Sequence, residues 1–273
     1  MKKRYHYDNS ATVADEGRIL DDFKIRSKIA YERYPHIFNC SYLTKHDKIN
    51  DKKALQHRSF LEDRATYDLF LNQKESKGTI LFIHGGYWQW CDKTDFAFIA
   101  QPILAAGYHL LLIEYPLAPT ATLTEINGAI TIALDYLYHY EKRIDQTEPT
   151  LLIGHSAGAH LAALNANHPL IDEVWLLSGL YQLESIAKSH LNRALQLSPK
   201  EIELLSPQSL PAPMGKEIKI IVGQNELPEL IYQSLSYHQK LSAEGAKSEL
   251  ILLPSDHYTI LDDLFNRLDR FSA

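Results

Sequence analysis

A serine between two glycines carries the clearest chemical signal in the sequence. The stretch Gly154-His155-Ser156-Ala157-Gly158 matches the pattern G-x-S-x-G, which places a nucleophilic serine on a sharp turn between a strand and a helix. The apolar run 150–153 predicts the strand and residues 159–165 predict the helix. Side chains at the glycine positions would collide with the neighbouring strand and helix. We therefore expect Ser156 to be a nucleophile, and the alternative is a tight turn with an incidental serine.

A nucleophilic serine needs a base, and the base needs an acid that orients it. In a parallel sheet such groups lie beyond the carboxyl ends of the strands. His257 follows the last predicted strand and comes after the serine in the chain, as the base does in this arrangement. Glu226 follows the preceding predicted strand and is the expected acid. Glu229 lies three residues further on and remains an alternative.

Acyl transfer also needs hydrogen-bond donors for the oxyanion that forms in the transition state. The stretch His84-Gly85-Gly86-Tyr87-Trp88 follows a predicted strand, and a glycine-rich backbone can approach a substrate closely. We expect the backbone N–H groups of Gly86, Tyr87 and Ala157 to be the donors. His84 is expected to fix the loop through hydrogen bonds rather than to act as a base.

The order of apolar segments indicates how these residues are positioned. Six short apolar runs predict strands at 79–83, 109–115, 150–153, 174–177, 218–222 and 249–253. Helical patterns lie between them, as in 124–141, and a further one follows the last strand. Strands that alternate with helices predict an α/β fold with a mostly parallel sheet flanked by helices.

Two regions interrupt this alternation within the single domain that we expect over residues 1–273. Residues 1–60 are polar and predict a helical or irregular extension, with one helix over 16–34 after Asp15 as its N-cap. Residues 181–213 are longer than one crossover needs and contain several prolines. They predict a lid-like insertion or pocket wall, or alternatively a structural excursion.

Composition excludes several classes of function. Acidic residues number 34 against 28 basic ones, and the net charge of −6 argues against nucleic-acid or anionic-membrane partners. Two cysteines, Cys40 and Cys91, argue against a disulfide framework or a thiolate zinc site. No apolar run approaches the ~20 residues that span a bilayer, and no apolar stretch follows Lys2-Lys3-Arg4. We expect a cytoplasmic protein with a small-molecule substrate, and a homodimer is compatible with the sequence.

Four stretches together resemble the kynurenine formamidase (arylformamidase) family of the α/β-hydrolase fold. They are His84–Trp88 with Asp92-Lys93 and Asp95-Phe96, Gly154–Gly158, Ser178-Gly179-Leu180-Tyr181, and Gly223–Glu226 with Pro228-Glu229. The resemblance covers about residues 77–264, and the likeness to HGG-type esterases is equally clear. It implies a triad of Ser156, Glu226 and His257. It also implies hydrolysis of an N-formyl arylamine such as N-formylkynurenine, without a cofactor or metal.

The sequence departs from the family at positions that bear on the substrate. The usual acid is aspartate, whereas this chain has Glu226, and Gln182 replaces a common aspartate. Tyr115-Pro116-Leu117-Ala118-Pro119 differs from the Tyr-Arg-Leu-Ala-Pro of related esterases. Alternative functions are therefore a carboxylesterase acting on short acyl esters, another small amidase, and a non-catalytic ligand receptor on the same fold.

Aromatic residues near these motifs predict a pocket for a flat leaving group. The expected lining residues are Tyr87, Trp88, Trp90, Phe96 and Tyr181, each of which could instead pack in the core. Lys93 is the one cation close to the motifs, and the insertion could contribute Arg193.

Overall fold

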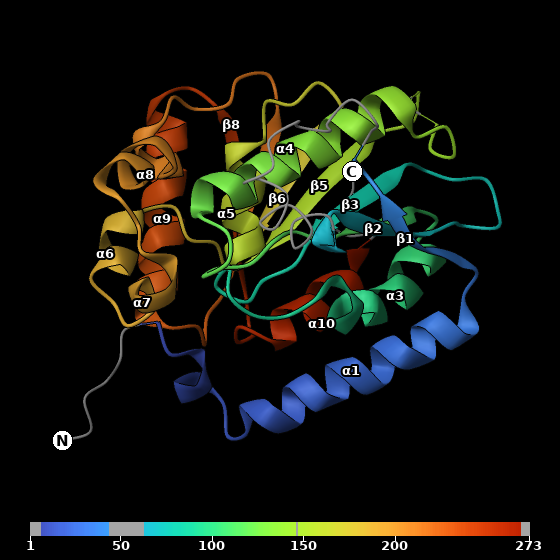
Figure 1. Ribbon diagram of the computed structural model, residues 1–273, viewed down its shortest axis with the longest axis horizontal. Coiled ribbons are helices and arrows are strands. Elements are labelled where there is room, and N and C mark those ends of the chain that lie inside the picture. The colour runs from blue at the N-terminus through green and yellow to red at the C-terminus, as the bar shows by residue number, and fades with distance from the viewer. Residues whose placement is uncertain (1–6, 44–62, 146, 269–273) are drawn as a thin grey trace, which may run out of the picture.

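The computed structural model describes residues 7–43, 63–145 and 147–268, and among them eight strands form one sheet (Figure 1). The strand order across the sheet is β1-β2-β4-β3-β5-β6-β7-β8. The strands are β1 (His36–Ser41), β2 (Thr66–Phe70), β3 (Thr79–Ile83), β4 (His109–Ile113), β5 (Thr150–His155), β6 (Glu173–Leu177), β7 (Glu217–Gly223) and β8 (Lys247–Leu253).

The predicted parallel sheet is confirmed, with two further strands at one edge. All strand pairs from β4 through β3 to β8 are parallel, while β1 pairs with β2 and β2 with β4 in antiparallel fashion. Residues 36–41, expected to be irregular, form the edge strand β1. The segment lacks the continuous apolar pattern that marked the central strands. Its pairing with β2 is also irregular between Ile37 and Cys40, where Asn39 has a φ of 53°. The predicted extension also includes residues 1–6 and 44–60, which lie outside the described residues.

Helices cover both faces of the sheet (Figure 1). The helices are α1 (Glu16–Arg33), α3 (Ala100–Ala105), α4 (Leu123–Tyr140), α5 (Ala157–Leu164), α6 (Leu183–Ala187), α7 (Asn192–Leu195), α8 (Pro199–Leu204), α9 (Pro228–Ala243) and α10 (Thr259–Phe265), with 3-10 turns η1 (Asn9–Thr12), η3 (Lys93–Ile99) and η4 (Pro207–Ser209).

Alternate residues of each central strand point to opposite faces. In β3, Leu81 and Ile83 join the core under α4, α5 and α9, whereas Ile80 and Phe82 join the core under η3, α3 and α10. Apolar side chains pack on both faces of the sheet, so every residue of the central strands β3 and β5 is buried.

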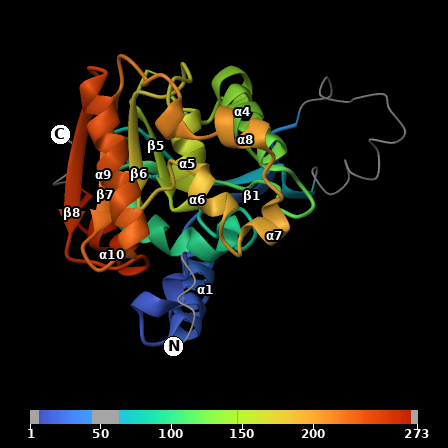
Figure 2. The same ribbon diagram turned by 90° about the vertical axis from the view of Figure 1, so that its left-hand side faces the viewer.

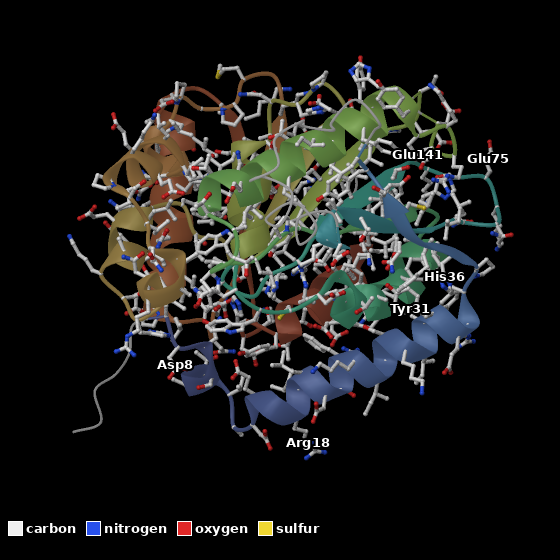
Figure 3. All side chains as sticks on the ribbon, in the orientation of Figure 1. Asp8, Arg18, Tyr31, His36, Glu75 and Glu141 are labelled. Atoms are coloured by element: carbon white, nitrogen blue, oxygen red, sulfur yellow. The ribbon has the colours of Figure 1, made fainter. Side chains whose placement is uncertain are left out.

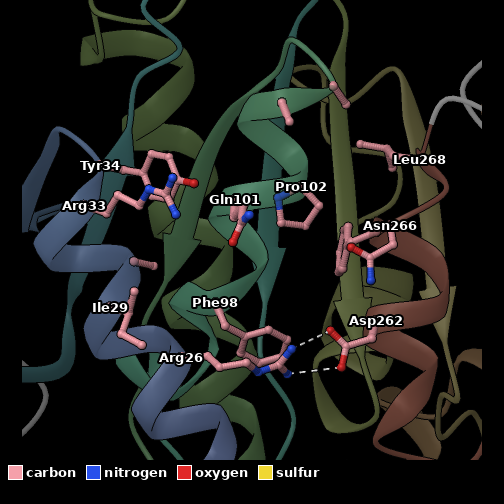
Figure 4. A pocket seen from close by; sticks show the side chains of 14 residues that line it. Arg26, Ile29, Arg33, Tyr34, Phe98, Gln101, Pro102, Asp262, Asn266 and Leu268 are labelled. Atoms are coloured by element: carbon pink, nitrogen blue, oxygen red, sulfur yellow. Dashed lines mark hydrogen bonds and ion pairs between the residues drawn. The ribbon is translucent and has the colours of Figure 1, made fainter.

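The long helix α1 lies across the layer formed by η3, α3 and α10 (Figure 1). It begins where the sequence predicts, because the Asp15 side chain accepts a hydrogen bond of 3.0 Å from the Arg18 backbone N–H. Figure 4 shows Arg26 of α1 bound to both oxygens of Asp262 on α10, at 2.8 and 3.1 Å. In Figure 3, Arg18 points away from the body of the molecule and Tyr31 points towards it, where its hydroxyl donates to Asp68 at 2.6 Å. These bonds fix α1 on the domain.

The segment 181–213 contains α6, α7, α8 and η4, which Figure 2 shows beside α4 and α5. It is anchored at several points. The backbone carbonyl of Leu205 accepts a 2.7 Å hydrogen bond from His160 Nε2 in α5, and that of Leu191 accepts one of 3.2 Å from Gln89 in the loop after β3. This segment therefore contacts the loop on which the oxyanion donors are expected.

Candidate active site

Ser156 stands in a strained turn between β5 and α5, as the sequence predicts. Its φ of 56° and ψ of −117° lie outside the conformations that side chains usually adopt. A Cβ on Gly154 would lie 2.2 Å from the Gly158 carbonyl oxygen, and one on Gly158 would lie 2.0 Å from the Ile83 carbonyl oxygen. Both glycines are therefore required by close backbone contacts. The Ser156 hydroxyl is buried and has no hydrogen-bond partner among the described residues.

His257 and Glu226 form a buried pair. The Nδ1 atom of His257 lies 3.0 and 3.1 Å from the two carboxylate oxygens of Glu226, and the Glu226 side chain is fully buried. Because a carboxylate only accepts hydrogen bonds, Nδ1 carries the proton and Nε2 is left as the basic nitrogen. Glu226 is thus the acid that the structure brings to His257, and Glu229 lies in the first turn of α9.

Close packing of two loops brings this pair together. A Cβ on Gly223, at the end of β7, would lie 2.3 Å from the Ser255 carbonyl oxygen. The same carbonyl accepts a 3.0 Å hydrogen bond from the Asn225 backbone. The loop after β7 therefore lies directly against the loop that carries His257, and a Cβ on Gly223 would also lie 3.2 Å from Glu226 Cγ.

His155 holds the backbone of the candidate base. Its Nε2 donates a 2.9 Å hydrogen bond to the His257 carbonyl oxygen, and the two rings lie 4.7 Å apart. Burial, followed by the neighbouring His257, lowers the pKa of His155 well below its usual value. The ring is therefore neutral, and its buried Nδ1 has no hydrogen-bond partner among the described residues.

The loop after β3 turns sharply at the residues expected as oxyanion donors. Gly86, Tyr87 and Trp88 have consecutive positive φ angles of 106°, 48° and 60°. A Cβ on Gly86 would lie 2.1 Å from the Trp90 carbonyl oxygen, so glycine is needed here. Among the described residues, the backbone N–H groups of Gly86, Tyr87 and Ala157 make no hydrogen bond. They remain available as donors to a ligand.

His84 anchors this loop, as expected. Its Nδ1 lies 2.8 Å from the Gly85 carbonyl oxygen and its Nε2 lies 3.0 Å from Glu114. Its ring stacks on Tyr115 at 4.3 Å, and the Tyr115 hydroxyl donates to the His84 carbonyl oxygen at 2.9 Å. The network is buried, and its bonds fix the loop.

A cavity of about 310 Å³ brings Ser156 and His257 together with Gly86 and Tyr87, whereas Glu226 and Ala157 are not on its lining. Its lining includes Ser156 and His257 together with Gly85, Gly86, Tyr87, Trp90, Cys91, Phe96, His155, His190, Tyr258, Leu20, Phe23 and the N-terminal residues Tyr7, Asp8, Asn9 and Glu16. A larger cavity of about 520 Å³ between α1, α3 and α10 (Figure 4) contains none of the predicted site residues. The smaller cavity is therefore the candidate active site.

The expected aromatic lining is brought to the cavity only in part. Tyr87, Trp90 and Phe96 line it. Trp88 is instead fully buried, with its ring edge-on to His160 at 5.0 Å, and Tyr181 stacks on Tyr237 at 4.3 Å. Both rings pack in the core, which was the alternative for each.

The two expected cations do not line the cavity either. Lys93 is buried against Asp68, with Nζ 3.3 Å from a carboxylate oxygen, and Arg193 is exposed on α7. Lys93 thus serves the sheet edge rather than a ligand.

No sequence signal pointed to the lining residues Asn9, Glu16 and Tyr258. Tyr87 donates from its hydroxyl to the Asn9 side chain at 3.0 Å, and the Tyr258 hydroxyl donates to Glu16. These partners lie 78 and 242 positions apart in the chain, so no local pattern could have paired them. Tyr258 alone lies next to a predicted site residue, because it follows His257 in the chain.

Comparison with known proteins agrees with this geometry. The pattern of the BD-FAE family matches residues 67–203. The chain is 30% identical to a kynurenine formamidase of Salmo salar over 205 residues, 68% of this chain and 67% of that protein. It is 27% identical to a kynurenine formamidase of Drosophila melanogaster over 230 residues, 77% of this chain and 76% of that protein.

Solved structures share the fold at low sequence identity. The esterase of Pyrobaculum calidifontis superimposes with a TM-score of 0.71 at 11% identity, covering 97% of this chain and 92% of that one. Esterase B of Lactobacillus rhamnosis has a TM-score of 0.65 at 18% identity, covering 97% and 95%.

The mostly parallel sheet and its structural neighbours define an α/β-hydrolase. The chain belongs to the BD-FAE and kynurenine formamidase family of these hydrolases and is an enzyme. Over the described residues, no helix has the length and apolar character needed to cross a membrane. Within the same ranges, no group of three or more His, Cys, Asp or Glu side chains could hold a metal ion.

Proposed function

We propose that the enzyme hydrolyses a small aryl formamide through an acyl-enzyme formed on Ser156. The observation that carries this proposal is the pairing of His257 Nδ1 with Glu226 at 3.0 Å beside a cavity that both His257 and Ser156 line. In such an arrangement the base, its orienting acid and the nucleophile share one site.

The proposed reaction starts with attack of Ser156 Oγ on the formyl carbon while His257 Nε2 accepts the hydroxyl proton. The tetrahedral oxyanion accepts hydrogen bonds from the free N–H groups of Gly86, Tyr87 and Ala157. The carbon–nitrogen bond then breaks, and His257 returns the proton to the departing arylamine. Water, deprotonated by His257, attacks the formyl ester; the bond to Ser156 Oγ breaks, His257 returns the proton to Oγ, and formate leaves.

The substrate class rests on two supports. The relatives at 27% and 30% identity are kynurenine formamidases, which favours N-formylkynurenine. The cavity is also partly aromatic, with Tyr87, Phe96 and Trp90 on its lining, and such rings suit a flat leaving group. We propose binding of the aryl ring against these side chains.

A comparison of substrates tests the proposal. We expect a higher kcat/KM for N-formylkynurenine than for p-nitrophenyl acetate and butyrate, measured on the same preparation. Ser156→Ala serves as the control, and both activities should fall by about 10⁴-fold or more in this variant. A preference for the esters, abolished by Ser156→Ala, would replace the formamidase by the esterase.

The carboxylesterase is the second candidate, because the structural neighbours are esterases and the same groups cleave esters by the same steps. A ligand receptor is disfavoured by the intact pair of His257 and Glu226. Cytoplasmic location, a homodimer and the absence of nucleic-acid binding stay predictions of the sequence. Light scattering tests the homodimer, and fractionation of cells tests the location.

A further inference from the structure

The first residues that the structure describes lie against the candidate active site. Tyr7, Asp8 and Asn9 all line the cavity that Ser156 also lines. Figure 1 shows this N-terminal segment, residues 7–9, in dark blue between the start of α1 and the helices of the insertion. The segment is therefore part of the wall of the site, although it lies far from the serine in the chain.

Buried hydrogen bonds fix the N-terminal segment on the domain. The Tyr7 hydroxyl lies 2.6 Å from Ser185 Oγ of α6 and accepts a 2.9 Å bond from Gln233 Nε2 of α9. The Gln233 side-chain oxygen in turn accepts from the backbone N–H groups of Tyr181 and Gln182, at 2.6 and 2.8 Å. Because Tyr7 and Gln233 are buried, this network holds the segment firmly against the start of the insertion.

The same segment binds the loop that carries the expected oxyanion donors. Asn9 is buried, and its side-chain oxygen accepts a 3.0 Å hydrogen bond from the Tyr87 hydroxyl. Burial raises the pKa of Tyr87 well above its usual value, so the phenol keeps its proton and is the donor of this bond. Among the described residues, Asn9 is the only hydrogen-bond partner of this hydroxyl.

The backbone of Tyr87 connects this bond to the proposed reaction. Its N–H group is one of the expected oxyanion donors, and its φ of 48° lies in the left-handed region that residues other than glycine rarely adopt. Rotation of this backbone would carry the hydroxyl away from Asn9, and a buried hydrogen bond would be lost. The bond therefore opposes relaxation of Tyr87 to a more usual conformation.

We propose that Asn9 is a positioning residue of this enzyme, which holds the backbone N–H of Tyr87 in place for the oxyanion through the Tyr87 hydroxyl. The inference rests on the proposed function and gives the N-terminal segment a part in catalysis beyond that of a wall. A donor that is fixed before the reaction stabilises the transition state without reorganisation. The substrate in its ground state gains less from such a donor, so Asn9 should act on kcat more than on KM.

Two single variants and their combination test this role as a double-mutant cycle on N-formylkynurenine. Asn9→Ala removes the acceptor of the bond and Tyr87→Phe removes its donor, and neither removes the backbone N–H. Loss of a whole oxyanion donor costs about 10²–10³-fold in kcat. Loosening one should therefore cost about tenfold in each variant, with KM changed by less than about threefold. If Asn9 acts through Tyr87, the double variant should be no slower than either single variant.

Two control variants show whether the loss is specific. Tyr31→Phe also removes a tyrosine hydroxyl that bonds an N-terminal element to the domain, here at 2.6 Å from Asp68, but Tyr31 does not line the cavity. Ser10→Ala changes the residue next to Asn9, whose hydroxyl bonds Asp8 at 2.6 Å. Both controls should keep kcat within about twofold. Expressing kcat per serine labelled by a fluorophosphonate corrects every variant for unfolded protein.

Three results would overturn the inference. An unchanged kcat with a raised KM in Asn9→Ala would make Asn9 a wall residue only. Losses that multiply in the double variant would mean that Asn9 does not act through Tyr87. An equal loss of kcat in Tyr31→Phe would mean that the effect is not specific to the oxyanion loop.

The same cycle with p-nitrophenyl acetate separates this inference from the proposed function, because ester cleavage needs the same oxyanion donors. If N-formylkynurenine is not hydrolysed while the acetate is, the formamidase proposal fails, and the acetate then decides the role of Asn9. If N-formylkynurenine is hydrolysed and the cycle shows no coupling, the proposed function stands and the positioning role is refuted.

Discussion

Replacing Glu226 by glutamine is expected to remove most of the activity while the fold survives. The carboxylate lies 3.0 Å from His257 Nδ1 and is shielded from solvent. When His257 accepts the serine proton, the two become an ion pair. At this distance and an effective dielectric constant of about 20, the attraction is about 5.5 kcal/mol. Losing it corresponds to about 10⁴-fold in kcat, and glutamine fits the same space without the charge.

The assay measures initial rates on N-formylkynurenine together with thermal unfolding. Glu229→Gln is the matched control, because Glu229 has the same side chain on the adjoining helix but is not the partner of His257. We expect this control to stay within about threefold of the unmodified enzyme. If Glu226→Gln retains more than a tenth of kcat at an unchanged melting temperature, the assignment of the acid is refuted. If Glu229→Gln is the inactive variant, the acid is Glu229.

Two further predictions concern stability. Gly158→Ala should lower the free energy of unfolding by about 3 kcal/mol or more, because the new Cβ would meet the Ile83 carbonyl oxygen at 2.0 Å. Gly128→Ala, inside α4 with nothing within 4 Å, should raise it by about 0.5–1 kcal/mol, and urea titration of both variants checks the pair. Burial lowers the pKa of His160 to about 4, so acid protonates the unfolded chain first and stability falls between pH 6.5 and 4, by about 3 kcal/mol for this residue. His160→Gln should lose correspondingly less stability over that interval, and equal losses in both proteins would contradict the burial argument.

The central sheet and the elbow were predictable because each has a local cause. Continuous apolar runs form strands covered on both faces, as β3 shows, and the two glycines around Ser156 mark close backbone contacts. Chain order and the strand-end rule predicted His257 and Glu226, which lie beside each other in the structure. In each case, the information lies within a few residues of the site.

The pocket wall was harder to predict because it depends on packing between distant segments. Trp88 carries the same apolar ring as Trp90, yet its backbone turn places it in the core while Trp90 stays about half exposed, at 52%. Glu16 lines the cavity from the first turn of α1, which is fixed on the domain by bonds such as that of Arg26 with Asp262, and Asp8 lines it from the segment before α1. Residue type alone does not distinguish such outcomes.

Covalent trapping of Ser156 tests the central claim most directly. Intact-mass analysis and peptide mapping after treatment with a fluorophosphonate should show one adduct, located on Ser156, with loss of hydrolysis in proportion to labelling. Ser156→Ala should acquire no adduct, and His257→Ala should label far more slowly because the hydroxyl has lost its base. Labelling at another residue, or full hydrolysis by Ser156→Ala, would contradict the account.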